Sequence, residues 1–432
     1  MRLRDPIEGW LAPLRPMLPR LTTADWTSLR RFATDLDVHL DDLPEGDPDA
    51  PGSQAAQLLN IRRRLAALRH TDLTEHGRDE AVRDHLVQAL RQFVCGFHDP
   101  DLRDASGAGH GRMIVRHGAE VAAAAWGARL RAGDLVGIAA SERHGGSRLR
   151  EITTTARDRP GGGWWLTGEK CWVSRLDEAS GFVVFFRNPG GAVTAAVVSA
   201  EAGGLRRQPV RPAGLGGWSW GTLQLVDVTV MPEDLVGEDG DGLTVFNEHF
   251  AHYRPLVTMT ALGAAASIHS AVADALRARV EMGIVSRPRD TALVALGRTH
   301  VELTAALLAV LATVAMGSAS FATSNLWSRV TKAYGVDAAH RASTDLPLLV
   351  GALGFAAGSR MTKIRNDLTG LLFADGIHDS LYRSAGRTLL EPEDPTIKSA
   401  RRSPDTLTGP PRARRGRRSG AGRGAATTAS PP

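Results

Sequence analysis

Residues 156–172 read ARDRPGGGWWLTGEKCW, and this stretch marks the change of sequence pattern that decides the fold. Three consecutive glycines, Gly161 to Gly163, supply a turn, and β-favouring residues flank them on both sides, which predicts a hairpin. We expect a β domain over residues 135–237, because the surrounding apolar runs have the lengths of strands. These runs lie at 135–140, 164–167, 182–186, 193–198 and 222–230.

On both sides of the β domain, apolar residues recur at helical spacing. The pattern predicts an N-terminal helical domain at residues 1–134, with helices over 23–36, 55–68, 80–94 and 113–130. It also predicts a C-terminal four-helix bundle at residues 238–395, with helices over 262–282, 290–316, 324–342 and one after Gly376. The predicted fold class is therefore an α+β multidomain protein with the order helical domain, β domain, helical bundle.

Composition is that of a globular protein of two or three domains, with 432 residues, 43% hydrophobic and 23% charged. The uncharged stretch 303–322 is long enough to cross a bilayer, but more than half of it is Ala, Gly, Ser or Thr. We therefore expect a buried bundle helix there and no membrane partner.

Cys95 and Cys171 are too far apart in sequence for a metal site or a disulfide framework. With no apolar signal-peptide core at the N-terminus, this indicates a cytoplasmic protein.

The net charge of +5 is concentrated in the C-terminal segment. Residues 396–432 hold nine Lys or Arg and one acidic residue, Asp405, so this tail carries +8 and the rest of the chain −3. The tail is rich in Pro, Gly and Arg and has little to bury, which predicts disorder. Contact with nucleic acid or an acidic partner is the alternative to a solvated tail, and we expect no nucleic-acid partner.

Two segments combine hydroxyl, charged and aromatic residues: 140–147 (ASERHGGS) and 167–174 (TGEKCWVS). They resemble two motifs of the acyl-CoA dehydrogenases, Thr-Glu-Pro-x-x-Gly-Ser-Asp and Asn-Gly-x-Lys-x-Trp-Ile-Thr. The resemblance covers roughly residues 20–390. That family is FAD-dependent and has the domain order inferred above.

The resemblance implies a role for four residues of these motifs. Ser141 would hydrogen-bond the flavin ring, Trp172 would pack on the isoalloxazine, and the Ser174 hydroxyl would reach the flavin N5 region. Ser147 would touch the pantetheine arm of the substrate. These residue types suit a flavin, because an aromatic ring shields it from water and hydroxyl donors stabilise arriving charge.

Two arginines depart from the first motif. Arg143 stands where the family has Pro, and Arg148 stands where it has Asp. Because Arg148 follows the residue expected at the thioester arm, it suits a phosphopantetheine or a carboxylated acyl group.

Two bundle segments continue the resemblance. Residues 279–283 (RVEMG) match the family's Arg-x-x-Phe-Gly, where the Arg binds the FAD pyrophosphate of a neighbouring subunit, so Arg279 implies a homo-oligomer, a dimer or a tetramer. Gly351 and Gly354 match a glycine loop that lies against FAD, where the small residues permit close approach. The family's Gln before this loop is Leu348 here.

The base of the reaction is the largest departure from the family. Many members use the Glu of a Tyr-Glu-Gly segment to remove the substrate α-proton, and the matching position here is Asp375. Three interpretations remain open: Asp375 is the base, Asp375 or Asp379 only caps the last helix, or His378 is the base. Arg254 matches a family Arg near the substrate, with a solvated helix cation as the alternative.

The resemblance implies an FAD-dependent enzyme that dehydrogenates the α,β-bond of an acyl thioester on CoA or on an acyl carrier protein. Its partner would be an electron-transfer flavoprotein or oxygen. Two alternatives come from the altered residues: an oxidase or monooxygenase on the same fold, and a flavin-binding subunit without catalysis. No residue pattern predicts a metal site.

Overall fold

We describe the fold from a computed structural model, which gives the structure of residues 5–42, 53–70, 78–145, 148–318, 321–356 and 358–390. The chain divides into a unit at residues 1–388 and a second unit from Leu389 to Pro432, of which only Leu389 and Leu390 are described. The predicted role of Ser147 and the predicted disorder of the tail at 396–432 therefore lie outside the described residues.

The N-terminal domain is helical, as predicted. Its helices are α1 (Thr23–Asp41), α2 (Ser53–Ala67), α3 (Arg78–His98), α4 (Arg112–His117) and α5 (Glu120–Arg131), with a short 3-10 helix η3 (Pro100–Asp104) before α4. The prediction of one helix over 113–130 was wrong. Gly118 ends α4 with extended backbone, ψ 159°, and a Cβ there would lie 2.6 Å from the carbonyl oxygen of Ile114. The Ala-rich run after it forms α5 separately.

The central domain is a seven-stranded sheet with the order β1-β4-β2-β3-β7-β6, and β5 pairs with β4. The predicted hairpin is β2 with β3, which pair antiparallel across the turn at Gly161 to Gly163. Parallel pairing joins β1 to β4, and the long strands β3 and β7 pair antiparallel. The bounds are β1 Val136–Ala139, β2 Thr155–Asp158, β3 Trp164–Ser174, β4 Gly181–Arg187, β5 Val193–Ser199, β6 Leu205–Pro209 and β7 Trp220–Val230.

Strand β4 shows why the sheet has apolar residues on both faces. Phe182, Val184 and Phe186 point into one apolar cluster formed with β3 and β7. The alternate residues Val183 and Phe185 point into a second cluster that includes side chains of α4 and α5. A strand covered on both faces reads as a continuous apolar run, which is how residues 182–186 appear in the sequence.

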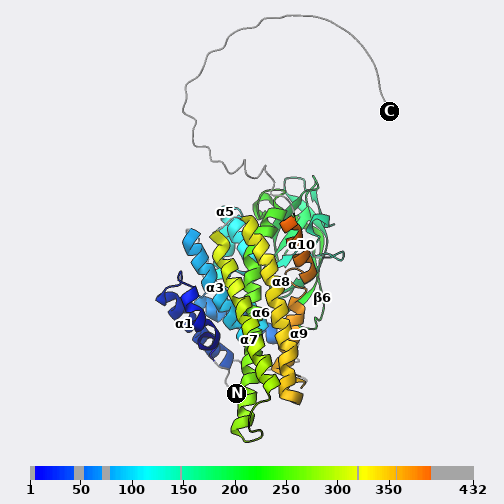
Figure 1. The fold of residues 1–432 in the computed structure, drawn as a ribbon. Helices are drawn as coiled ribbons and strands as arrows, with labels where there is room; N and C mark the ends of the chain where they lie inside the picture. The colour runs from blue at the N-terminus through cyan, green and yellow to red at the C-terminus, as the bar shows by residue number, and fades with distance from the viewer. Residues whose placement is uncertain are drawn as a thin grey trace, which may run out of the picture. The chain divides into compact units, whose positions relative to one another are not determined.

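The C-terminal domain holds α6 (Gly242–Glu281), α7 (Asp290–Ala315), α8 (Phe321–Asp345), a 3-10 segment η8 (Leu346–Gly354), α9 (Arg360–Leu371) and α10 (His378–Leu390). Helices α6 to α9 run alongside one another, with α1 to the left of them and the strands to the right (Figure 1). Two predictions here were incomplete. Helix α6 begins 20 residues before the predicted start at Leu262, because it is buried nearly all round and shows no single apolar stripe. Helix α9 is largely polar and was not predicted.

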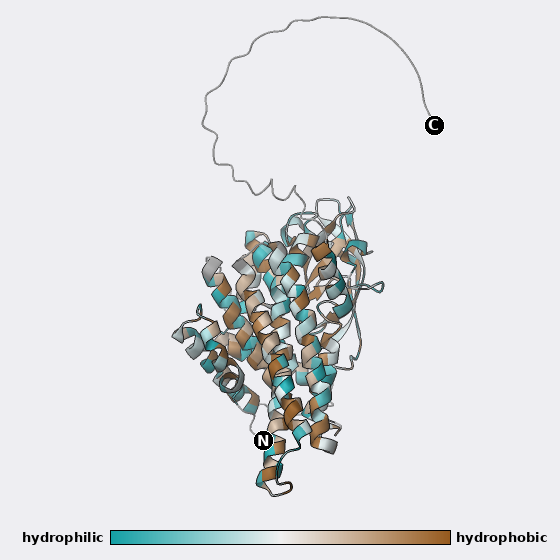
Figure 2. Ribbon diagram, viewed as in Figure 1, coloured by the Kyte–Doolittle hydropathy of each residue, from teal (hydrophilic) through white to brown (hydrophobic). Residues whose placement is uncertain are grey.

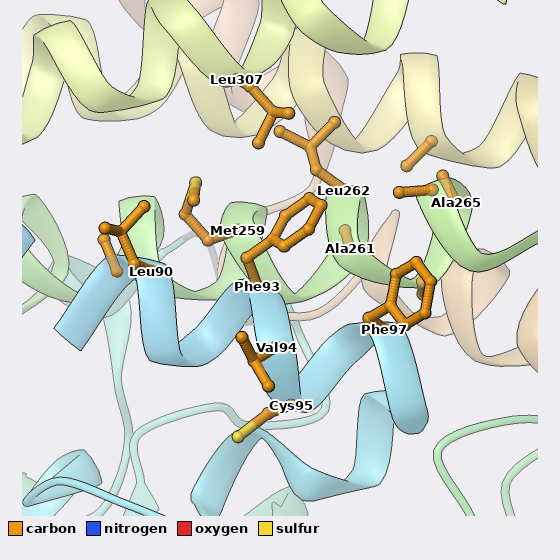
Figure 3. Close-up of a cluster of buried hydrophobic side chains, with 14 of the residues drawn as sticks. Leu90, Phe93, Val94, Cys95, Phe97, Met259, Ala261, Leu262, Ala265 and Leu307 are labelled. Carbon is orange, nitrogen blue, oxygen red and sulfur yellow. The ribbon is translucent and has the colours of Figure 1, made fainter. Parts of the chain in front are cut away.

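The bundle packs against the N-terminal domain through glycines. A Cβ at Gly96 of α3 would lie 1.9 Å from the Thr260 carbonyl oxygen, and one at Gly263 of α6 would lie 2.1 Å from that of Phe93. Close approach of the two backbones brings Phe93 and other α3 side chains onto α6, with Leu307 of α7 beyond them (Figure 3). This contact fixes α6, the helix that carries part of the site.

Helices α6 and α7 are both long and apolar enough to span a membrane by length and composition. In the most apolar stretch of each helix, 78% is buried inside the protein for α6 but only 22% for α7. The expectation of a buried helix at 303–322 therefore holds for one face of α7 only, where Leu303, Leu307 and Val310 enter the core. Hydrophobic and hydrophilic residues are interspersed along the bundle helices (Figure 2).

Candidate active site

An exposed tryptophan stands on a bulge of β3. Between Lys170 and Val173 the pairing with β7 shifts by one residue, so Cys171 and Trp172 stand opposite a single residue of β7. Trp172 adopts the left-handed backbone region, with φ 56°, and its side chain is 62% exposed. A strained non-glycine residue that presents a large apolar ring to solvent is typical of a ligand-binding position.

A buried ion pair supports this bulge from beneath. Lys170 Nζ lies 2.7 Å from Glu142 Oε1, and both side chains are almost fully buried. Burial raises the pKa of Glu142, but hydrogen bonds from Lys170, Thr153 and Thr154 outweigh it and bring the pKa down to about 2. Burial lowers the pKa of Lys170 to about 8 against the opposite effect of Glu142. At neutral pH the pair is therefore charged.

The segment that carries Ser141 is joined to β3 at the same place. The Cys171 N–H donates to the Ser141 carbonyl oxygen at 2.8 Å, next to Glu142 and Lys170. Ser141 is half-buried and lies beside the strand that presents Trp172. The structure thus brings two of the predicted flavin residues together.

The third predicted flavin residue, Ser174, ends β3 and is buried. Its Oγ accepts a hydrogen bond from Arg175 Nη1 at 2.5 Å. Arg175 also has a positive φ of 58°, is buried, and forms an ion pair with Asp104 of η3, with Nε 2.7 Å from Oδ2. Burial lowers the pKa of Arg175, but Asp104 outweighs it and holds the pKa above its usual value.

The loop between α9 and α10 carries Asp375, which has a φ of 57°. Two cations hold its backbone: Lys332 Nζ of α8 donates to the carbonyl oxygens of Leu371 and Gly376 at 2.8 and 2.7 Å, and Arg254 Nε of α6 donates to that of Asp375 at 3.0 Å. These bonds fix a turn that an L-residue rarely adopts.

The Asp375 carboxylate itself has no hydrogen-bond partner among the described residues. Burial raises its pKa, and the positive charges of Lys332, Arg103, Arg175 and Arg254 partly oppose that rise. Because Arg175 faces Asp375 and also bonds Ser174, the loop and the end of β3 meet in one charged region, in which Arg175 and Ser174 are buried and Asp375 is half-buried.

The geometry of this loop bears on the other two interpretations, a helix cap at Asp375 or Asp379 and a base at His378. No hydrogen bond joins the carboxylate of Asp375 or Asp379 to the first turn of α10 in the described structure, so the geometry does not support the capping interpretation. His378 Nδ1 lies 2.6 Å from Asp337 Oδ1, and burial lowers its pKa. His378 is therefore engaged by α8, whereas the Asp375 carboxylate is not engaged.

Arg254 is buried on α6 and is no solvated helix cation. Its Nη1 has no partner among the described residues, which is costly for a guanidinium N–H. Burial and the charge of Arg329 lower the pKa of Arg254 to about 10, so it stays protonated. The unpaired N–H indicates a ligand oxygen at this position.

Three predicted site residues do not join this region. Arg279 is exposed at the end of α6, 25 residues beyond Arg254, or about 38 Å along the helix. Gly351 is exposed, has a φ of 69° and no heavy atom within 4 Å of a built Cβ, so it leaves open space for a close approach. Gly354 packs against Pro347, whose carbonyl oxygen would lie 2.4 Å from a Cβ, and so serves the loop itself.

Three residues of the site had no signal in the sequence: Asp104, Arg175 and Lys332. Asp104 and Lys332 act through contacts with residues far away in the chain. Arg175 acts through Ser174, the motif residue that precedes it. Glu142 and Lys170 both lie within recognised motifs, and their pairing could have been suggested from there.

One group of carboxyls within the described ranges is spaced like a metal site: Asp99, Asp101 and Asp367. The Lys363 ammonium stands among them, at 2.7, 2.9 and 2.7 Å from one oxygen of each. A cation of the chain thus already occupies the centre of this cluster. Asp367 also accepts from the Leu215 N–H at 2.5 Å, so it ties α9 to the β domain.

Two models of known families match the chain. A model of the acyl-CoA dehydrogenase middle domain matches residues 137–228, and a model of the acyl-CoA dehydrogenase C-terminal domain matches residues 240–390. Together they cover more than half of the sequence. The chain belongs to the acyl-CoA dehydrogenase family.

Curated relatives match over shorter stretches. The human mitochondrial short-chain specific acyl-CoA dehydrogenase is 30% identical over 160 residues, which are 35% of this chain and 38% of that protein. A probable acyl-CoA dehydrogenase of Bacillus subtilis is 34% identical over 99 residues, 23% of this chain and 17% of that protein. The matched stretches therefore span less than half the length of these curated relatives.

Solved structures confirm the predicted fold. Butyryl-CoA dehydrogenase of Megasphaera elsdenii superposes with a TM-score of 0.73 at 17% identity, covering 86% of this chain and 99% of that one. A glutaryl-CoA dehydrogenase of Mycobacterium smegmatis in complex with FADH2 gives 0.72 at 18% identity, covering 86% and 95%. A prolyl acyl carrier protein oxidase gives 0.68 at 17% identity, covering 85% and 99%. The family thus has the helical, β and helical order derived from the sequence.

Proposed function

We propose that this protein binds FAD and dehydrogenates the α,β-bond of an acyl thioester. The observation that carries the proposal is that Arg175, at the end of the strand that presents Trp172, bonds Ser174 and also faces the half-buried, unpaired carboxylate of Asp375. An exposed ring, a hydroxyl and a basic carboxylate are the groups that such a reaction needs from the protein.

The described residues fit FAD. Trp172 presents an aromatic face next to Ser141 and Ser174. Gly351, apart from this region, leaves open space beside η8 for a close approach, and the buried guanidinium N–H of Arg254, which has no partner among the described residues, is assigned to the substrate. When bound, FAD supplies the acceptor for the hydride of a dehydrogenation. Ser141, Trp172 and Ser174 would hold its ring system, and Arg279 would serve the site of a second copy, since it lies about 38 Å along α6 from Arg254. We accordingly propose a homo-oligomer, a dimer or a tetramer.

Asp375 is the proposed general base. Its carboxylate accepts the proton of the carbon next to the thioester carbonyl, and the C–H electron pair becomes part of the new double bond as the neighbouring carbon loses a hydride. A base needs a free lone pair and a pKa above the usual carboxyl range. The Asp375 carboxylate has no hydrogen-bond partner among the described residues, and removal from solvent raises its pKa. The backbone hydrogen bonds from Lys332 and Arg254 keep the carboxylate in place.

The substrate is an acyl group on CoA or on an acyl carrier protein. Related structures include enzymes named for both carriers. Arg148, 62% exposed and paired with Glu151 at 3.2 Å, is proposed to favour a phosphopantetheine or a carboxylated acyl group. Replacing Arg148 with Asp changes the preference among acyl groups if this holds, and leaves it unchanged if Arg148 has no role.

The first experiment is to purify the protein, record its visible spectrum and add a panel of acyl-CoAs and acyl carrier proteins without oxygen. A flavin spectrum that bleaches with one thioester supports the proposal, and a protein that cannot take up FAD contradicts it. A flavoprotein that no thioester bleaches would instead be a non-catalytic subunit. Adding electron-transfer flavoprotein or oxygen to the bleached protein then identifies the acceptor, because an oxidase recolours rapidly with oxygen alone.

We propose a cytoplasmic location. Cys95 and Cys171 are both free, in keeping with this proposal.

A further inference from the structure

The hydroxyl of Ser174 has only one way to donate a hydrogen bond. Its oxygen accepts from Arg175 Nη1 at 2.5 Å, and a guanidinium has donors but no acceptor. The Ser174 hydrogen therefore points away from Arg175. No acceptor for it exists among the described residues, although the side chain is buried. A buried donor without an acceptor is costly and indicates that a ligand supplies one.

Arg175 is built into this position by its own contacts. It has a positive φ and a buried side chain, and Asp104 holds the guanidinium through Nε at 2.7 Å. Arg62 Nη1 in turn donates to the Asp104 carbonyl oxygen at 2.6 Å. The guanidinium thus has one orientation, and its Nη1 has Ser174 as a fixed target.

We propose that Arg175 is a positioning residue that orients the Ser174 hydroxyl as a donor toward the flavin bound beside Trp172. This inference rests on the proposed function, since it requires FAD at the β3 face. A charged donor on the oxygen polarises the hydroxyl and strengthens the bond that its hydrogen makes. Because a donor at the flavin stabilises the negative charge that arrives on reduction, Arg175 raises the reduction potential of bound FAD through Ser174.

A second route from Arg175 to the flavin must be separated from this one. Arg175 is a buried cation that also faces Asp375, so an effect of its charge through space is the competing explanation. A double-mutant cycle distinguishes the two routes, since only the route through Ser174 disappears when the hydroxyl is removed.

The experiment measures the reduction potential of bound FAD in wild type, S174A, the pair R175Q/D104N, and the three changes combined. The pair of changes removes both charges together, so that Asp104 is not left as an unpaired buried carboxylate. We expect S174A and R175Q/D104N each to lower the equilibrium constant for FAD reduction about tenfold, which is about 30 mV for a two-electron couple. The combined variant is expected to match S174A.

Three results would overturn the inference. One is an equal shift from R175Q/D104N whether or not the S174A change is also present, which assigns Arg175 to a through-space effect. Another is an unchanged potential in R175Q/D104N with FAD still bound. The third applies if R175Q/D104N does not fold: R175K, which keeps the ion pair but not the planar fork, is then measured, and a wild-type potential there shows that the orientation of the guanidinium is irrelevant.

Arg62 provides the matched control. It is as buried as Arg175 and contacts the same Asp104, but through the backbone oxygen, and it does not touch Ser174. R62Q is expected to cost stability and to leave the FAD potential unchanged. A failure of the proposed function looks different, because wild-type protein would then take up no FAD at all.

Discussion

Glu142, which is buried, and Asp375, which is half-buried, are two carboxylates of the candidate site with opposite surroundings. Glu142 accepts five hydrogen bonds, from Lys170 and from the N–H and hydroxyl groups of Thr153 and Thr154. Asp375 accepts none among the described residues, and the cations near it bind loop carbonyls instead. The first carboxylate has a pKa of about 2, and the second has a raised pKa. Because its pKa is so low, Glu142 stays ionised and serves the structure, whereas the raised pKa of Asp375 suits a group that takes up a proton.

The comparison extends to backbone strain. Trp172 and Asp375 both hold a positive φ, which costs on the order of 1–3 kcal/mol for a non-glycine residue. At Trp172 the strain is offset by a side-chain ion pair under the strand, and at Asp375 by cations on the loop backbone. Charged groups thus stabilise both positions. Beneath Trp172 the Glu142 carboxylate is held in an ion pair, whereas the Asp375 carboxylate is free to react.

The largest expected effect is that of D375N on turnover. Loss of the base is expected to slow anaerobic bleaching by an acyl thioester about 100-fold to 10,000-fold. The same variant is expected to be at least as stable as wild type at pH 7, because it removes a half-buried charge that has no hydrogen-bond partner among the described residues. Urea unfolding and the bleaching rate are measured on one preparation. A large loss of stability would contradict the contrast with Glu142.

The next effect is that of E142Q on stability. Lys170 would lose the carboxylate that offsets its burial, at a cost of about 3–5 kcal/mol in urea unfolding. The matched control is E142Q/K170M, in which neither charge remains, and most of the stability is expected to return. If the double variant is no more stable than E142Q, the ion pair is not the reason for the loss.

A smaller effect is expected for K332M, which removes the donor to the Leu371 and Gly376 carbonyl oxygens. Two unsatisfied carbonyls would cost about 1–3 kcal/mol. The ionised base works above its pKa, and Lys332 lowers that pKa, so its removal moves the acidic limb of the rate profile to higher pH. The other charged and titratable groups facing Asp375 are Tyr253, Arg254, Arg175 and Arg103. An acidic limb that stays in place would show that Lys332 acts on the loop backbone alone.

The smallest effect is the acid sensitivity that Glu142 confers. Its folded-state pKa of about 2 lies below the ordinary 4.5, so its contribution is complete above about pH 4.5 and is lost as pH falls toward about 2. Unfolding followed against pH should show a weaker dependence in E142Q/K170M within that window. An unchanged dependence would mean that another carboxyl governs it.

The sequence predicted the order of the three domains well, because strands such as 182–186 and the glycine hairpin have strong local patterns. It failed where helices lose their apolar stripe, as in the first half of α6, or are mostly polar, as in α9. Within the site, motif residues such as Ser141 and Trp172 could be predicted. Arg175, Asp104 and Lys332 could not, since their function comes from contacts across 71 and 44 residues of chain.

The most direct test of the central claim is proton exchange at the substrate α-carbon. The FAD-loaded protein is incubated without oxygen in D2O with the acyl thioester that bleaches it, and deuterium entering the α-position is followed by NMR. The account predicts rapid exchange with wild type and none above background with D375N, although both bind the thioester. Equal exchange by the two proteins would show that Asp375 is not the base.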